Sequence, residues 1–148
     1  MKNKVYRPKF DKLFYLIWVP LIILLLVITI LSWNELIPLI IMLFTDVFCL
    51  YFLFSSLVAY VEFRDDSLFV KCGFILKKEI PYSKILEINK ERKLYTYSML
   101  SIKNAMEHVN IKYNKYDWIS VSVIDNDAFI VDLDKRINKS GINFGVEL

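Results

Sequence analysis

The stretch AYVEFRDDSLFVKCGF, residues 59–74, joins two parts of the chain that differ in composition. It follows an apolar run without a break, yet two runs of alternating apolar residues flank the turn-forming residues 65–67. Such runs around a polar turn are typical of two paired antiparallel strands. The sequence therefore predicts that a long apolar helix runs directly into a β-hairpin, with no linker between them.

Composition divides the 148 residues into a basic flank, an apolar region and a charged domain. Residues 1–12 hold five Lys and Arg against one Asp, and residues 13–61 contain only two charged side chains, Glu35 and Asp46. Residues 62–148 contain 14 basic and 13 acidic side chains. This last part is long enough to bury one core, so we expect it to fold as a domain of its own. Its balanced charge and the absence of a nucleic-acid motif argue against nucleic-acid binding.

The apolar region predicts a hairpin of two transmembrane helices, over residues 13–33 and 36–61. The first run has no charged residue, and the second is interrupted only by Asp46. A helix that crosses a bilayer needs about 20 apolar residues, whereas a signal peptide has an apolar run of about 7–15. The link between the two runs is so short that the helices must be antiparallel neighbours.

The basic flank predicts the orientation of this hairpin. Its five Lys and Arg side chains precede the first helix, and the link contains none. The positive-inside rule then places the N-terminus in the cytoplasm, and two crossings return the chain to the same side. We expect a multi-pass plasma-membrane protein with both termini cytoplasmic, in which Cys49 and Cys72 are reduced thiols.

Asp46 is the one acidic residue inside a predicted span, about ten residues or roughly 15 Å from its start. An ionisable group at this depth is costly and is a candidate functional residue. One interpretation is a protonated carboxyl group that is hydrogen-bonded to the neighbouring helix or to a second copy of the chain, which would make a homo-oligomer. The other is an ion or proton pathway.

Alternating apolar residues predict strands over residues 60–64, 67–74, 75–81, 108–113 and 118–123, and an irregular segment over 94–107. Residues 125–141 predict an amphipathic helix instead, because Phe129, Ile130, Leu133 and Ile137 form one stripe at helical spacing. Asp125 or Asp127 can cap its start, and Gly141 suits its end. The pattern indicates an α+β domain whose antiparallel strands close into a small barrel or two packed sheets, with the helix covering an open end.

The string LFVKCGFILKKEIPYSKILEI, residues 68–88, resembles the core of a bacterial pleckstrin-homology-like (bacterial PH) domain family of small two-helix membrane proteins. The similarity covers residues 60–138 and rests mainly on a strand that ends in Gly73 and on the spacing of Ile80, Pro81, Tyr82, Ile85 and Ile88. His108 stands about where the family usually has an Arg. The resemblance implies the PH-like fold, with a C-terminal helix that closes a bent sheet, and it implies no catalytic activity.

The sequence offers little chemistry for an enzyme. His108 is the only histidine and falls on the polar side of a predicted strand, so we expect it to be solvated. Cys49 and Cys72 lack the spacing of metal ligands, and neither a phosphate-binding glycine loop nor a nucleophile motif occurs. We therefore predict no enzymatic activity, no cofactor and no metal.

One basic region is a candidate contact for anionic lipid headgroups. Near a membrane, each Lys or Arg contributes up to about 1 kcal/mol of attraction to an anionic surface. The alternative is an ordinary solvated surface, because Glu79, Glu87 and Glu91 lie among the basic residues. The candidates are Lys77, Lys78, Lys84, Lys90, Arg92 and Lys93.

Together these features predict an integral membrane protein whose cytoplasmic PH-like domain binds or scaffolds at the inner membrane face. Its partner would be anionic lipid headgroups or another protein. The alternative is an immunity protein that protects against a membrane-active bacteriocin, and a third hypothesis is the ion or proton pathway through Asp46.

Overall fold

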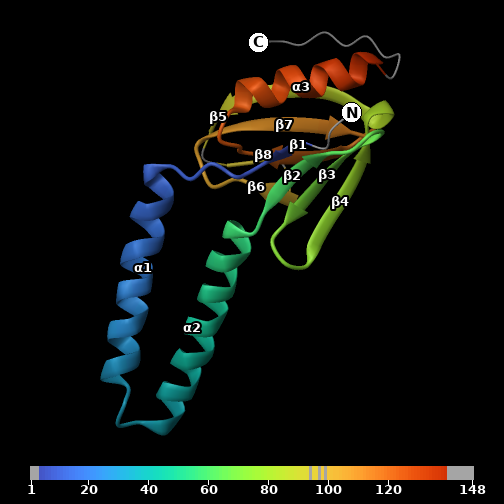
Figure 1. Ribbon diagram of the computed structural model, residues 1–148. Helices are drawn as coiled ribbons and strands as arrows, with labels where there is room; N and C mark the ends of the chain where they lie inside the picture. The colour runs from blue at the N-terminus through green and yellow to red at the C-terminus, as the bar shows by residue number, and fades with distance from the viewer. Residues whose placement is uncertain (1–3, 94, 97, 99, 140–148) are drawn as a thin grey trace.

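The computed structural model describes residues 4–93, 95, 96, 98 and 100–139 of the chain (Figure 1). Two antiparallel helices, α1 (Lys12–Leu31) and α2 (Leu36–Leu57), project from one side of a domain of strands and one further helix. Only two residues, Val58 and Ala59, lie between the end of α2 and strand β2 (Tyr60–Phe63). The predicted passage from helix to strand without a linker is confirmed, although α2 ends four residues earlier than expected.

The first sheet has the order β1-β2-β3-β4 and is antiparallel throughout. Strands β2 and β3 form the predicted hairpin, in which Val61 lies opposite Val70 and the Arg64 amide donates to the Ser67 carbonyl at 2.9 Å. The other strands of this sheet are β1 (Lys4–Tyr6), β3 (Ser67–Cys72) and β4 (Leu76–Pro81).

The second sheet has the order β5-β7-β8-β6 and follows the short 3-10 helix η1 (Tyr82–Lys84). It consists of β5 (Ile85–Arg92), β6 (Leu100–Ile102), β7 (Glu107–Tyr113) and β8 (Asp117–Val121). Strand β6 pairs with β8 in parallel, so the expectation of purely antiparallel strands is wrong at this edge. The described strands form two separate sheets, which confirms the predicted alternative of two packed sheets and shows that the expectation of a closed barrel is wrong.

Helix α3 (Asn126–Lys139) is the predicted amphipathic helix. The Asp125 carboxylate accepts from the Ala128 amide at 2.9 Å and caps its start, as expected. Gly141, the expected end signal, lies outside the described residues. The apolar stripe from Phe129 to Ile137 is buried against the sheets, and it therefore belongs to the core of the domain.

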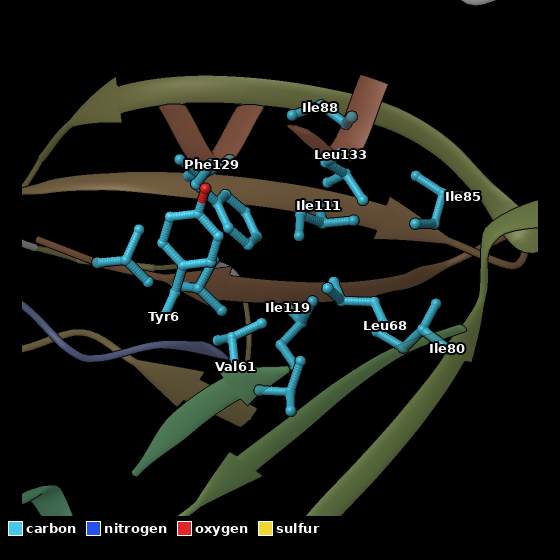
Figure 2. Close-up of a cluster of buried hydrophobic side chains, with 14 of the residues drawn as sticks. Tyr6, Val61, Leu68, Ile80, Ile85, Ile88, Ile111, Ile119, Phe129 and Leu133 are labelled. Carbon is cyan, nitrogen blue, oxygen red and sulfur yellow. The ribbon is translucent and has the colours of Figure 1, made fainter. Parts of the chain in front are cut away.

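The core lies between the two sheets and α3 (Figure 2). Val61, Leu68 and Ile80 reach it from the first sheet, and Ile111 and Ile119 from the second. Tyr6 of β1 also belongs to the core. Its ring lies edge-on to Phe63 and Phe129, with centroids 5.6 and 5.3 Å away, and its hydroxyl donates to Asp132 at 2.7 Å.

The N-terminal segment is thus part of the folded domain. Beyond β1, the Ile124 amide donates to the Arg7 carbonyl at 3.2 Å, and the Lys9 amide donates to the Ser122 carbonyl at 3.0 Å. Residues 4–9 therefore hydrogen-bond to both sheets, first to β2 and then to the chain after β8. The structure adds β1 to the sheet that the sequence placed entirely after residue 59.

Tyr6→Ala should lower the free energy of unfolding by about 3 kcal/mol, because it removes a buried aromatic ring from the core. Val5 of the same strand is 53% exposed, so Val5→Ala is a matched control that should change stability by no more than about 0.5 kcal/mol. Urea titration of the purified full chain measures both values. Equal effects of the two substitutions would contradict the place of β1 in the core.

Candidate membrane-facing site

The two apolar helices are fixed to the domain at their upper ends by paired strands. Strand β1 precedes α1 and β2 follows α2, and the two strands pair with Lys4 opposite Phe63 and Tyr6 opposite Val61. The backbone hydrogen bonds of this pairing hold together the two helix ends that are nearest the domain. The end of α2 therefore cannot move far from the start of α1.

Asp11 makes a second connection between α1 and the domain. One carboxylate oxygen accepts from the Leu13 and Phe14 amides at 3.0 and 3.2 Å and caps the helix. The other accepts from the Met106 amide at 2.7 Å, in the segment before β7. A single side chain thus orients the start of α1 on the second sheet.

The tip of hairpin β3–β4 lies beside the last turns of α2. Figure 1 shows this tip next to the end of α2 that is nearest the domain. The Phe74 ring is 5.8 Å from the Tyr51 ring of the helix. Gly73 has a φ of +80°, and a Cβ atom at this position would lie 1.7 Å from the Ser55 hydroxyl oxygen. Both the turn and the close approach to the helix therefore require glycine.

A cleft of about 170 Å³ lies behind this contact, between α2, the hairpin and β6. Its walls carry the polar side chains of Ser55, Ser56, Ser101 and Asn104 beside the apolar ring of Phe52. The cleft combines polar and apolar walls at the junction of the helices and the domain.

The hairpin tip itself is apolar and exposed, and it is bordered by positive charge. Phe74, Ile75 and Leu76 are 47%, 75% and 53% exposed. Lys71 and Lys77 lie directly opposite each other in the register of the two strands, one residue pair behind the tip. Apolar side chains next to lysines are a typical composition for a surface that contacts lipid.

The six predicted basic residues are divided between the two sheets and η1. Lys77 and Lys78 lie on β4, near the hairpin tip, and Lys84 follows in η1. The remaining three belong to the region of β5 in the other sheet. Of these, Lys90 forms ion pairs with Glu107 and Asp127 at 3.1 and 2.7 Å, and Lys93 pairs with Glu91 at 3.1 Å; Arg92 lies between them in sequence.

Asp46 accepts a hydrogen bond from the Thr29 hydroxyl of the neighbouring helix at 2.7 Å. The contact corresponds to one of the alternatives drawn from the sequence, a hydrogen bond to the neighbouring helix. The Thr29 hydroxyl also lies 2.9 Å from the Leu25 carbonyl of its own helix, and its single proton can be donated to only one of the two acceptors at a time. The Asp46 side chain is therefore held within the helical hairpin, where it contributes to the packing of α1 on α2.

His108 is fully buried, so the expectation of a solvated histidine is wrong. Asn110, Ser120 and Ser122 are buried on the same sheet as well, because both faces of its central strands are covered. The Nδ1 atom of His108 faces the Met106 carbonyl at 3.0 Å and therefore carries a proton, while Nε2 has no hydrogen-bond partner among the described residues. Burial is the main cause that lowers the pKa of His108, and the nearby Lys103 acts in the same direction.

The remaining reactive side chains are consistent with a structural role. Cys49 and Cys72 are free thiols, and burial raises the pKa of the Cys72 thiol to about 11, which keeps it protonated. Within the described residues, no group of three or more His, Cys, Asp or Glu side chains could hold a metal ion.

Comparison with known proteins supports the resemblance seen in the sequence. The family model described as "Bacterial PH domain" matches residues 59–137, which is more than half of the chain. No curated protein and no solved structure matches the chain.

Asp46→Asn should unfold at nearly the same temperature as the parent, because the amide keeps an oxygen acceptor for Thr29. Thr29→Val removes the donor and should cost about 0.6 kcal/mol, the average for an interhelical hydrogen bond in a membrane. Thermal unfolding of the full chain in detergent compares the two variants. A large loss of thermal stability in Asp46→Asn with none in Thr29→Val would contradict this account, because the carboxyl group would then stabilise the helices through a contact other than the Thr29 bond.

The buried, neutral His108 should make the protein less stable in mild acid. Because its pKa is lowered in the folded state, the unfolded chain binds the extra proton first, and stability falls once the pH drops below about 6.5. The slope reaches at most about 1.4 kcal/mol per pH unit. His108→Gln cannot take up this proton and should flatten the profile between pH 7 and 5. Identical pH profiles for variant and parent would contradict this account.

Proposed function

This chain belongs to the bacterial PH domain family, and from that premise we propose that it is an integral membrane protein whose PH domain binds or scaffolds at the cytoplasmic face. PH-like domains are generally binding modules without catalytic activity, and they commonly bind lipids or proteins. The proposed partners are therefore anionic lipid headgroups or a second protein.

The surface of the two helices is the observation that carries the proposal. Both are long and apolar enough to cross a membrane. The only buried side chain of α1 is Phe14, and α2 has none. The core helix of a soluble protein buries its apolar face, whereas these helices expose apolar side chains on all sides, as a lipid environment requires.

The link between the helices fits such a span. Trp33 lies just beyond the end of α1, where the link would reach the membrane interface. Tryptophan is enriched at both interfaces of a membrane. The helices of 20 and 22 residues are about 30 and 33 Å long, close to the thickness of a hydrocarbon core of about 30 Å.

The opposite end of the domain offers a second surface, directed away from the helices. The turn between β2 and β3 carries Asp65 and Asp66 and borders a cleft of about 310 Å³ that Arg136 and Lys139 also line. Acidic and basic groups together suit a protein partner better than an anionic lipid surface. Under this proposal, the domain contacts the membrane at the end from which the helices project and a cytoplasmic partner at the opposite end.

The immunity role against a bacteriocin stays a prediction of the sequence and shares the same membrane arrangement.

The basic flank supports the orientation with both termini in the cytoplasm. Lys4, Arg7, Lys9 and Lys12 all precede or begin α1, and the link has no Lys or Arg.

Cysteine labelling in intact cells tests this topology. In a background with Cys49→Ser and Cys72→Ala, Asn34→Cys in the link should react with a membrane-impermeant maleimide from outside. Tyr116→Cys, at a position 77% exposed in the turn between β7 and β8, should react only after lysis. The reverse pattern would overturn the orientation, and reaction of both before lysis would overturn the membrane span.

A further inference from the structure

We propose that the tip of hairpin β3–β4, residues 73–76, inserts into the lipid leaflet on the cytoplasmic side, beside α2. This inference rests on the proposed membrane span of α2. It adds a third point of membrane contact to the two helices, and it makes the hairpin a lipid-contacting element of the domain itself.

The position of the tip along α2 sets its depth. Tyr51 lies six residues before the end of α2 at Leu57, which corresponds to about 9 Å along the helix axis. Phe74 contacts this residue, and Gly73 lies against Ser55, one turn closer to the domain. The hairpin therefore does not stop at the end of the helix but runs alongside its last turn and a half.

This depth places the tip below the lipid headgroups. The 22 residues of α2 extend over about 33 Å, only slightly more than the hydrocarbon core of about 30 Å. When α2 spans the bilayer, a side chain beside Tyr51 must lie among the acyl chains of the cytoplasmic leaflet, close to the headgroups. The hairpin cannot stay in water unless it separates from the helix.

The residues at the tip have the chemistry that this position requires. Phe74, Ile75 and Leu76 are consecutive exposed apolar side chains, which is unfavourable in water and favourable in lipid. The hairpin tip and the neighbouring helix α2 therefore both expose apolar side chains.

Lys71 and Lys77 lie where the hairpin would pass through the headgroup region. Like charges directly opposite each other on neighbouring strands are unfavourable, and among the described residues neither lysine has an acidic partner. Lys71 lies over the ring of Tyr60, at 5.5 Å from its centroid. Lipid phosphates between the two ammonium groups would compensate the repulsion.

Gly73 holds the tip at this depth rather than letting it swing away. Its positive φ makes the tight turn, and the missing side chain lets the turn contact Ser55 directly. The tip therefore enters the leaflet as part of a rigid unit with α2.

Depth-dependent fluorescence quenching on the full chain tests the proposal. In the Cys49→Ser/Cys72→Ala background, an environment-sensitive dye is attached at Ile75→Cys, with Tyr116→Cys as the water-exposed control and Phe44→Cys within α2 as the lipid control. The protein is reconstituted in phosphatidylcholine vesicles with and without phosphatidylglycerol. Aqueous iodide and lipids with a spin label at a shallow acyl position serve as the two quenchers.

The dye at Ile75 should be quenched severalfold less by iodide than the dye at Tyr116, and strongly by the spin-labelled lipid. Protection from both quenchers would show that protein covers the tip and would overturn the proposal. Iodide access at Ile75 with protection at Phe44 would overturn hairpin insertion alone, whereas iodide access at both positions would overturn the membrane span on which it rests.

The role of the two lysines is tested in the same vesicles. Lys71→Gln/Lys77→Gln should increase the access of iodide to the dye at Ile75 when phosphatidylglycerol is present and have little effect in pure phosphatidylcholine. An equal effect in both kinds of vesicle would contradict the contact with anionic headgroups.

Discussion

The pairing of β1 with β2 is the constraint on which the arrangement of the molecule depends. One strand leads into α1 and the other follows α2, so their hydrogen bonds close the helical hairpin at its upper end. The same residues 4–9 then bond to the chain after β8 and tie the first sheet to the second. The direction of both helices relative to the domain is therefore built into the sheet. In the proposed membrane setting, the domain would have little freedom to rotate on its anchor.

The elements with strong periodicity could be predicted from the sequence. The two long apolar runs, the hairpin around residues 65–67 and the stripe of α3 each carry a local pattern, and each forms the expected element. Strand β1 could not be found in this way, because three residues that include Lys4 are too few to show alternation. The parallel pairing of β6 with β8 depends on contacts between distant segments, which no local pattern encodes.

The candidate site shows the same division. The basic residues of β4 and the acid in α2 were found because charge is visible in a sequence. The role of Gly73 could not be predicted in this way. Its role follows from the close approach of Ser55, whose position in α2 relative to Gly73 no local pattern shows. His108 was misread because alternation assumes one solvated face. Side chains on both faces of β7 are buried instead, so that polar and apolar side chains of one strand are buried together.

Because the chain is synthesised from its N-terminus, strand β1 is made long before the strand with which it pairs. Strand β1 leaves the ribosome before either helix, and its partners β2 and Val123 only after both. With α1 and α2 in a bilayer, these strands can meet only if both helix ends emerge on the same side. A chain with one helix misinserted would leave Tyr6 and Phe63 separated by the membrane and its core unfinished. In the proposed membrane setting, completion of the domain would act as a check on correct insertion, and chains that fail it would expose an unfolded core to cellular proteases.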